Sequence, residues 1–207
     1  MSKLVLIRHA ESEWNKKAMW TGRADPDLTP EGRIAASASA LFIKDLKIDM
    51  AYTSPSKRCR ETLDEIKKAL GLTSLETYDP IELMERDYGD LTGKNKWEVK
   101  KHVGDDKFIR IRRGWDEPIP NGESLKDVYE RIIPYYKLEI QPKLKNGKNI
   151  LIVSSNNLLR SLMKYLENIS DVDIATHEIG VGSIKTYEID ENGNVLNSKI
   201  LNTTFVP

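Results

Sequence analysis

Two runs of consecutive aliphatic residues constrain the fold of this 207-residue chain more than any other feature. They are Leu4-Val5-Leu6-Ile7 and Ile150-Leu151-Ile152-Val153. Four aliphatic residues in a row suit a strand in a sheet that is covered on both faces. Longer segments with helical periodicity alternate with these short runs, a pattern typical of a layered α/β domain.

The remaining pattern predicts further elements on both sides of these strands. Thr29 and Pro30 suit a helix start, since threonine caps and proline fits the first helical position. We expect this helix to present an apolar face, with Pro134 kinking a later helix. The expected elements are strands at Lys3–Ile7, Met50–Thr53 and Asn149–Ser154; helices with apolar faces Ile34, Ala38, Leu41, Phe42 and Leu125, Val128, Ile132, Ile133, Tyr136; helices over 57–70 and up to Glu167; a surface loop at Trp115–Gly122; and a hairpin of Ser183–Ile189 and Val195–Leu201 around Asn192-Gly193.

Composition narrows the class of protein. Lys+Arg and Asp+Glu are both 32, so the formal charge is zero and the basic excess that nucleic acid demands is absent. No apolar run approaches a signal peptide or a membrane span. A single cysteine, Cys59, excludes an intrachain disulfide and points to a reducing compartment. We therefore expect one cytoplasmic domain over 1–207, with no linker or repeat, no nucleic-acid partner and no membrane association.

Histidine is scarce: the chain holds only His9, His102 and His177. Their spacing resembles no structural zinc site, so we expect no metal. His9 follows Arg8 directly after the first predicted strand, where open α/β sheets place ligands. An arginine can hold phosphate or carboxylate with two hydrogen bonds, and a histidine can act as a base, a nucleophile or a ligand. His102 follows two lysines and is expected on a solvated helix face.

The context of Arg8-His9 resembles the histidine phosphatase superfamily and, within it, the cofactor-dependent phosphoglycerate mutases. The opening Arg-His-Gly/Ala-Glu motif is matched by Arg8 to Glu11, and further matches follow in order over nearly all of the chain. They are Asn15; Thr21-Gly22; Asp27-Leu28-Thr29; Tyr52-Thr53-Ser54; Lys57-Arg58; Glu85-Arg86 with Tyr88-Gly89; Gly93-Lys94-Asn95-Lys96; Arg112-Arg113-Gly114; Glu123-Ser124-Leu125; and Leu159-Arg160 to Lys164-Tyr165-Leu166. The resemblance implies a three-layer αβα fold, phosphoglycerate mutase-like, with a mostly parallel sheet and an antiparallel edge.

The resemblance also implies a role for each matching residue. His9 would accept a phosphoryl group, flanked by Arg8 and Arg58, and Glu85 would be the general acid/base. The substrate-binding residues would be Asn15, Thr21, Gly22, Arg86, Tyr88, Lys96, Arg112 and Arg113. The implied activity is that of a glycolytic and gluconeogenic isomerase, which interconverts 2- and 3-phosphoglycerate and needs 2,3-bisphosphoglycerate as phosphoryl primer but no metal. A small molecule is the expected partner, and relatives are often homodimers.

Two positions depart from the mutase pattern. Counting back from Arg160 places Ser155 where the family has its second histidine and Asn156 where it has glycine, whereas Asn157 matches. Serine is a shorter donor that is never cationic, and losing a transition-state donor typically costs on the order of 10²–10³ in rate. Asp87 stands where the mutases usually carry histidine, and it should weaken anion binding unless an arginine compensates.

Three functions remain open at this point. The first is mutase activity, with Ser155, Asn156, Asn157 and backbone N–H groups at a helix N-terminus forming an altered phosphate cradle. The second is a phosphatase that hydrolyses the phosphohistidine, and the third is a catalytically weak phospho-ligand-binding protein. The segment between Arg113 and Glu123 is short, and the chain ends soon after its last predicted strand. Without a covering tail, we expect phosphatase leakage beside any mutase activity.

Overall fold

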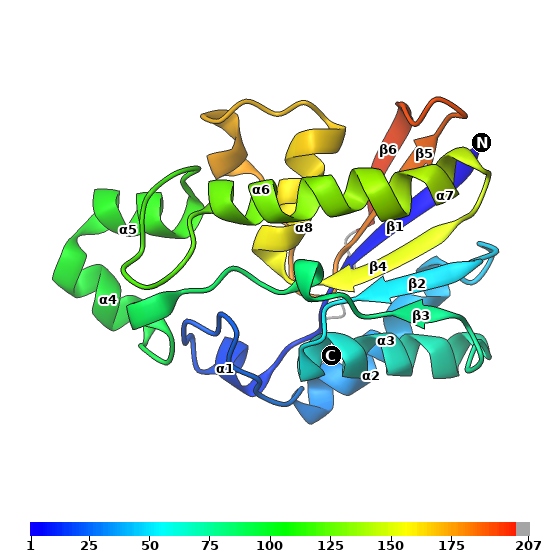
Figure 1. Ribbon diagram of the computed structural model, residues 1–207. Coiled ribbons are helices and arrows are strands. Elements are labelled where there is room, and N and C mark those ends of the chain that lie inside the picture. Colours follow the sequence, from blue (N-terminus) through cyan, green and yellow to red (C-terminus); the bar gives the residue numbers. More distant parts are fainter. Residues whose placement is uncertain (202–207) are drawn as a thin grey trace.

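Six strands form a single mixed sheet at the centre of the protein (Figure 1). The computed structural model describes residues 1–201. Across the sheet the strand order is β3-β2-β4-β1-β5-β6. The strands are β1 (Ser2–Arg8), β2 (Met50–Thr53), β3 (Thr77–Tyr78), β4 (Ile150–Ser154), β5 (Ile184–Ile189) and β6 (Val195–Leu201).

The sheet is parallel from β3 to β1 and antiparallel beyond it. β1 and β2 both pair in parallel with β4, and β3 pairs in parallel with β2. β5 runs antiparallel to β1, and β6 antiparallel to β5. The expected mostly parallel sheet with an antiparallel edge is therefore confirmed. Arg8 is in register with Ser154, so β1 and β4 end side by side.

Helices cover both faces of the sheet, as Figure 1 shows. One core lies between the sheet and both η1 (Ala40–Phe42) and α3 (Lys57–Leu70), and α2 (Pro30–Ser39) packs against α3. The other lies beneath α6 (Leu125–Tyr135), η4 (Tyr136–Ile140), α7 (Gln141–Lys145) and α8 (Asn156–Leu166). The aliphatic residues of β1 alternate between the two cores, Leu4 and Leu6 in one, Val5 and Ile7 in the other. Burial on both faces explains why these strands carry no polar alternation.

The structure confirms most of the expected elements and corrects one of them. Thr29 caps α2 by accepting a hydrogen bond from the Gly32 backbone N–H at 2.9 Å. The apolar face that we expected to be buried is instead exposed, with Ile34 at 71% and Leu41 at 64% exposure. Small residues form the buried face because α2 packs tightly there: a Cβ on Gly32 would lie 2.3 Å from the Glu11 carbonyl oxygen.

The apolar stripe of the helix that starts at Leu125 is buried as expected. Just after Pro134, the α-helical hydrogen-bonding pattern of α6 gives way to the π-helical segment η4. The hairpin around Asn192-Gly193 joins β5 to β6, and the segment Trp115–Gly122 forms a loop. His102 is exposed on its helix, as predicted. The expectation of a missing covering tail concerns residues 202–207, which lie outside the described part of the chain.

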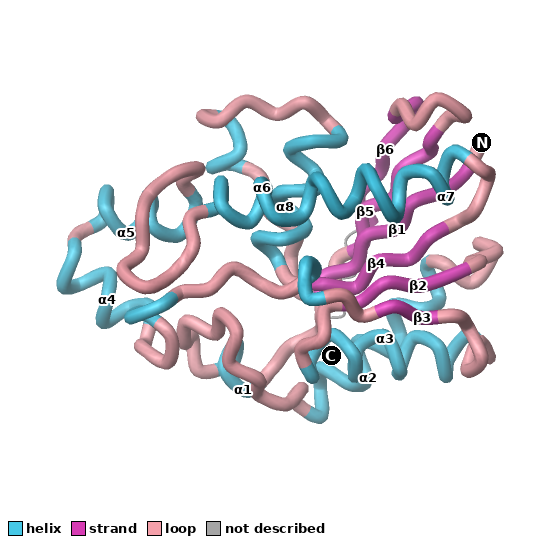
Figure 2. The backbone as a smooth tube through the Cα atoms, viewed as in Figure 1, coloured by secondary structure: helices cyan, strands magenta, loops and turns pink. Residues whose placement is uncertain are grey.

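A third group of elements lies in the segment after β1 and in the connections from β3 to α6 and from α8 to β5 (Figure 2). These are α1 (Glu13–Lys16), η2 (Ile81–Leu83), η3 (Gly89–Leu91), α4 (Lys96–Val103), α5 (Asp105–Arg113) and η5 (Asp173–Thr176). α4 and α5 project past the end of the sheet and pack on a small core that includes Trp20, Tyr88 and Phe108. This group supplies the outer wall of the site described below.

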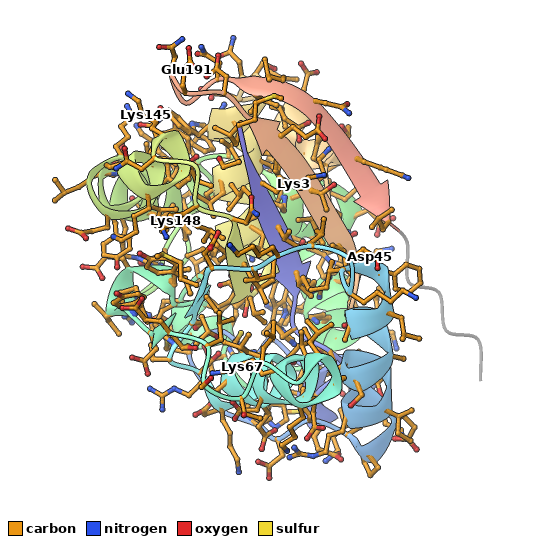
Figure 3. All side chains as sticks on the ribbon, turned by 90° about the vertical axis from the view of Figure 1, so that its right-hand side faces the viewer. Lys3, Asp45, Lys67, Lys145, Lys148 and Glu191 are labelled. Carbon is orange, nitrogen blue, oxygen red and sulfur yellow. The ribbon has the colours of Figure 1, made fainter. Side chains whose placement is uncertain are left out.

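The opposite end of the sheet carries charged surface side chains. Viewed from that side, Figure 3 shows charged side chains such as Lys3, Lys145 and Glu191 around the starts of the strands. Lys3 pairs there with Glu188 at 3.5 Å, a surface contact of small energetic value. None of the helices within residues 1–201 is long and apolar enough to cross a membrane.

Candidate active site

A pocket opens where β1 and β4 end, beneath the projecting α4 and α5. Charged groups converge in this pocket, whereas a larger hollow of about 730 Å³ beside α4 contains no arginine. The carboxyl edge of parallel strands is where open α/β sheets bind ligands. Its walls are formed by Arg8, His9, Asn15, Trp20, Thr21, Gly22, Arg58, Glu85, Tyr88, Lys96, Arg112, Arg113, Asn156, Asn157 and Glu178.

His9 lies on the floor of this pocket and is 4% exposed. Its backbone N–H donates to the Ser154 carbonyl oxygen at 3.0 Å, which fixes the residue at the end of β4. The ring Nδ1 lies 2.7 Å from the Ala10 carbonyl oxygen. A carbonyl can only accept, so Nδ1 must carry the proton and Nε2 must hold the lone pair. Nε2 is therefore the ring nitrogen whose lone pair is available for attack on an electrophile.

Arg58, the second residue of α3, reaches across to His9. Its Nε–H donates to His9 Nε2 at 3.3 Å. Nη1 donates to the Ala24 carbonyl at 2.8 Å, and Nη2 donates to the Gly22 carbonyl at 2.9 Å. These bonds hold the guanidinium rigidly beside the nucleophilic nitrogen. A fixed planar cation at this point suits the stabilisation of a phosphoryl group.

The surroundings keep the His9 imidazole neutral. Burial is the main cause that lowers its pKa well below the ordinary value, and the positive charges of Arg58, Arg8 and Lys96 lower it further. The hydrogen bond to Ala10 opposes this shift without cancelling it. A neutral ring keeps its Nε2 lone pair at physiological pH, as nucleophilic attack requires.

Glu85 is the buried carboxylate of the pocket and is held by backbone donors. Oε1 accepts from the Arg86 backbone N–H at 2.7 Å, and Oε2 lies 3.5 Å from the Asn157 backbone nitrogen near the start of α8. The Asn157 side chain is in turn fixed, because its Nδ2 donates to the Tyr88 hydroxyl at 2.7 Å. Arg160 donates to Asn157 Oδ1 at 3.0 Å. This network fixes a carboxylate in the same pocket as His9.

Cations from α4 and α5 close the outer side of the pocket. Asn95 caps α4 by accepting from the Trp97 and Glu98 backbone N–H groups, which places Lys96 at the first position of the helix. Arg112 and Arg113 occupy the last turn of α5. Burial, together with the charges of Arg112 and Arg8, lowers the pKa of Lys96 to about 8. The pocket thus presents a cluster of cations that an anionic ligand would stabilise.

The tertiary structure brings together all but two of the residues that the sequence singled out, although their roles remain predictions. Arg86 is one exception, because its fully buried guanidinium donates to the Ile111 carbonyl at 2.9 Å and to the Glu117 carbonyl at 3.4 Å. Its Nε donates to the Glu123 carbonyl. Arg86 therefore ties the end of α5 to the loop after it rather than lining the pocket.

Ser155 is the other exception. It is fully buried, at the N-cap position of α8, and its hydroxyl caps no backbone group there. Instead its Oγ accepts from Arg58 Nη2 at 3.3 Å and lies 3.8 Å from Cys59 Sγ. Its neighbour Asn156 does line the pocket. The hydroxyl of Ser155 thus faces the arginine that holds His9.

Asp87, which stands where the mutases usually carry histidine, has a nearby arginine that compensates its charge. Its carboxylate accepts from the Gly89 backbone N–H at 2.8 Å and lies 3.6 Å from Arg23 Nε. Asp87 does not line the pocket, so its charge does not face the cations there.

Two residues of the pocket were not predicted, Trp20 and Glu178. Trp20 directly precedes the predicted pair Thr21-Gly22, and this adjacency could have indicated it. Its buried Nε1 and the buried Thr21 Oγ1 have no hydrogen-bond partner within the described chain. No local motif marks Glu178, which lies in the loop between η5 and β5. His177 beside it bonds the Asp173 carbonyl with Nδ1 and stays outside the pocket.

Sequence comparison decides the family. A family model described as the histidine phosphatase superfamily (branch 1) matches residues 4–201. The chain belongs to this superfamily. A 2,3-bisphosphoglycerate-dependent phosphoglycerate mutase of Parvibaculum lavamentivorans is 40% identical over 96% of this chain and 95% of the relative. The Cytophaga hutchinsonii protein of the same name is 43% identical over 91% and 88%.

Solved structures of the superfamily share the fold. A mycobacterial glucosyl-3-phosphoglycerate phosphatase superposes with a TM-score of 0.80 over 96% of each chain, at 18% identity. At this identity the likeness shows the fold alone. Within residues 1–201, no group of three or more His, Cys, Asp or Glu side chains is arranged to hold a metal ion.

Proposed function

We propose that this member of the superfamily is a phosphoglycerate mutase, which interconverts 2- and 3-phosphoglycerate through a phosphohistidine on His9. The observation that carries the proposal is the lone pair of His9 Nε2, held beside Arg58 on the floor of a cation-lined pocket. The relatives that are about 40% identical over most of the chain bear the mutase name. A neutral imidazole is itself a competent nucleophile near pH 7 and can accept the phosphoryl group directly.

The charge of the pocket supports a substrate with more than one anionic group. Arg8, Arg58, Lys96, Arg112 and Arg113 all line it. A phosphate monoester carries about −1.5 to −2 at neutral pH, and a carboxylate adds one further negative charge. Glu85 and Glu178 line the pocket as well, so the five cations and two carboxylates leave a net charge of about +3, which is more than a lone phosphate balances. A phosphoglycerate uses them better, because its phosphate and carboxylate lie close together.

Buried donors without a partner support the same ligand chemistry. Arg8 Nε, Trp20 Nε1 and Thr21 Oγ1 are buried in the pocket wall and make no hydrogen bond within the described chain. A buried donor without a partner costs roughly 1–3 kcal/mol, which an oxygen-rich ligand would recover. The same residues fit 2,3-bisphosphoglycerate as primer, which when bound supplies a phosphoryl group for His9.

The residues of the chain account for each step of the transfer. His9 Nε2 attacks phosphorus in line with the departing oxygen, and Arg58, freed from Nε2, donates to a phosphoryl oxygen. Glu85 takes the proton of the attacking substrate hydroxyl when the phosphoryl group leaves His9, and it returns this proton in the reverse direction. Arg112, Arg113 and Lys96 hold the remaining anionic groups. Positioning and charge stabilisation are the main contributions that such a transfer needs.

A coupled mutase assay with and without 2,3-bisphosphoglycerate tests the proposal. Wild-type protein should need the primer, and His9→Ala should lose both mutase turnover and the acid-labile phosphoenzyme. His102→Ala is the matched control, because His102 is an exposed histidine on α4 outside the pocket. Mutase activity that survives in His9→Ala would refute the scheme. Primer hydrolysis without mutase turnover would identify a phosphatase, and tight binding without turnover would identify a phospho-ligand-binding protein.

A further inference from the structure

Glu178 places a negative charge directly beside two arginines of the pocket, where it would repel an anionic ligand. Its Oε1 lies 3.5 Å from Arg8 Nη1, and its Oε2 pairs with Arg113 Nη2. The carboxylate thus bridges two arginines that reach the pocket from β1 and α5. A ligand carboxylate or phosphate that bridges Arg8 Nη1 and Arg113 Nη2 must take the same position, because these are the two donor groups that Glu178 occupies.

The Glu178 carboxylate is charged in this position. Burial would raise its pKa, but the hydrogen bond from Arg113 and the charges of Arg113 and Arg8 outweigh burial and lower the pKa below the ordinary value. The carboxylate therefore cancels part of the positive charge of the pocket at every physiological pH. A ligand that leaves it in place meets a less cationic site.

The backbone beside Glu178 is anchored while its side chain stays accessible. Arg8 Nη1 donates to the Ile179 carbonyl at 2.8 Å, and the Ile179 N–H donates to Asn156 Oδ1 at 3.2 Å. Ile179 itself is 2% exposed. The Glu178 side chain is 36% exposed, so its carboxylate can rotate into solvent without moving the backbone. A residue that served only to brace the loop would gain little from such exposure.

We propose that Glu178 competes with the ligand for the anion position between Arg8 and Arg113 and thereby sets the specificity of the pocket. A ligand with a single phosphate can bind beside His9 and leave Glu178 in place. A ligand whose second anionic group reaches Arg113 must displace the carboxylate, and its affinity is reduced by that exchange. The inference rests on the proposed function, which supplies the phosphate-and-carboxylate probe.

Two ligands and two matched variants test this competition. Isothermal titration calorimetry without primer measures the binding of 3-phosphoglycerate and of inorganic phosphate. Glu178→Gln keeps the size of the side chain and removes its charge, so it should bind 3-phosphoglycerate roughly tenfold more tightly and inorganic phosphate at most about threefold more tightly. Glu178→Asp, which is one methylene shorter, should lie between wild type and Glu178→Gln.

Glu191→Gln is the control for net charge. Glu191 is an exposed residue of the turn between β5 and β6, at the far end of the sheet (Figure 3). β1 is seven residues long, so this turn lies about 20 Å from the pocket, well beyond the screening length of physiological salt. Both affinities should therefore stay within about twofold of wild type. Thermal unfolding of each variant checks that folding is intact.

The outcomes separate this inference from the proposed function. It is overturned if Glu178→Gln leaves 3-phosphoglycerate binding unchanged or weaker, or if it strengthens the binding of both ligands equally. The selective gain in a protein without mutase turnover would support the competition and reject the mutase. Mutase turnover without the selective gain in affinity would support the mutase and reject the competition. If neither wild type nor Glu178→Gln binds 3-phosphoglycerate, both proposals fail.

Discussion

Replacing Ser155 by alanine distinguishes two possible roles for this residue, positioning Arg58 or contacting the transferring phosphoryl group. The two roles predict different losses of kcat. The hydroxyl is fully buried and accepts from Arg58 Nη2 at 3.3 Å, while the same Nη2 also donates to the Gly22 carbonyl at 2.9 Å. Arg58 therefore keeps a second acceptor when the hydroxyl is removed. A hydrogen bond from a charged group contributes about 1.5–3 kcal/mol, but Nη2 keeps the Gly22 carbonyl and recovers part of this, so Ser155→Ala should lower kcat by at most about tenfold.

A direct role in catalysis would give a different result. A donor that touches the transferring phosphoryl group is typically worth on the order of 10²–10³ in kcat. The assay is the coupled mutase reaction at saturating 2,3-bisphosphoglycerate, with thermal unfolding measured on the same samples. A loss of 100-fold or more in a variant with an unchanged Tm would refute the positioning role that we derive from the geometry.

Ser161→Ala is the matched control for this experiment. Ser161 is also a fully buried serine of α8, and its hydroxyl donates to the Asn157 backbone carbonyl at 3.1 Å, a bond within the helix that contacts neither Arg58 nor His9. The substitution removes the same atom from the same helix. Its kcat should remain within about twofold of wild type, since removing a helix back-bond changes stability more than catalysis.

Three further predictions follow from the structure. Burial and nearby cations lower the pKa of Lys96 to about 8, so this amine loses its proton above pH 8. Because a bound anion favours the protonated amine, the affinity for 3-phosphoglycerate, measured by calorimetry, should fall by at most roughly tenfold per pH unit above pH 8. Glu85→Gln should lower kcat by roughly 10²–10⁴ and change the Kd of 3-phosphoglycerate little. Gly32→Ala should destabilise the fold by about 1–3 kcal/mol in urea unfolding, because its Cβ would meet the Glu11 carbonyl at 2.3 Å.

Each of these predictions has a result that contradicts it. The pH dependence should disappear in Lys96→Arg, whose guanidinium stays charged, so an unchanged profile in that variant would assign the titration to another group. Glu85→Gln with near-normal kcat would remove Glu85 from proton transfer. A Gly32→Ala protein as stable as wild type would show that the segment around Glu11 can move away from α2.

The sequence alone was sufficient for most of the fold. Uninterrupted aliphatic runs predicted buried strands, Thr29-Pro30 predicted a helix start, and Asn192-Gly193 predicted a hairpin; all three are present. These signals are local, because capping, turn geometry and strand burial each depend on a few neighbouring residues. The face of α2 was not predictable in this way. Its exposed residue Ile34 is more apolar than the buried Gly32, which is selected by close packing rather than by hydrophobicity.

The candidate site, like the fold, was predictable from the sequence only in part. The resemblance of the ordered motifs to the histidine phosphatase superfamily was enough to predict most of the pocket lining. Only the tertiary structure decided which way the side chains point. Arg86 turns away because backbone carbonyls of a distant loop accept its donors, and Ser155 faces Arg58 because the two meet from positions 97 residues apart. Glu178 belongs to the pocket because the bonds of Ile179 anchor its backbone there and because Arg8 and Arg113, far from it in sequence, pair with its carboxylate.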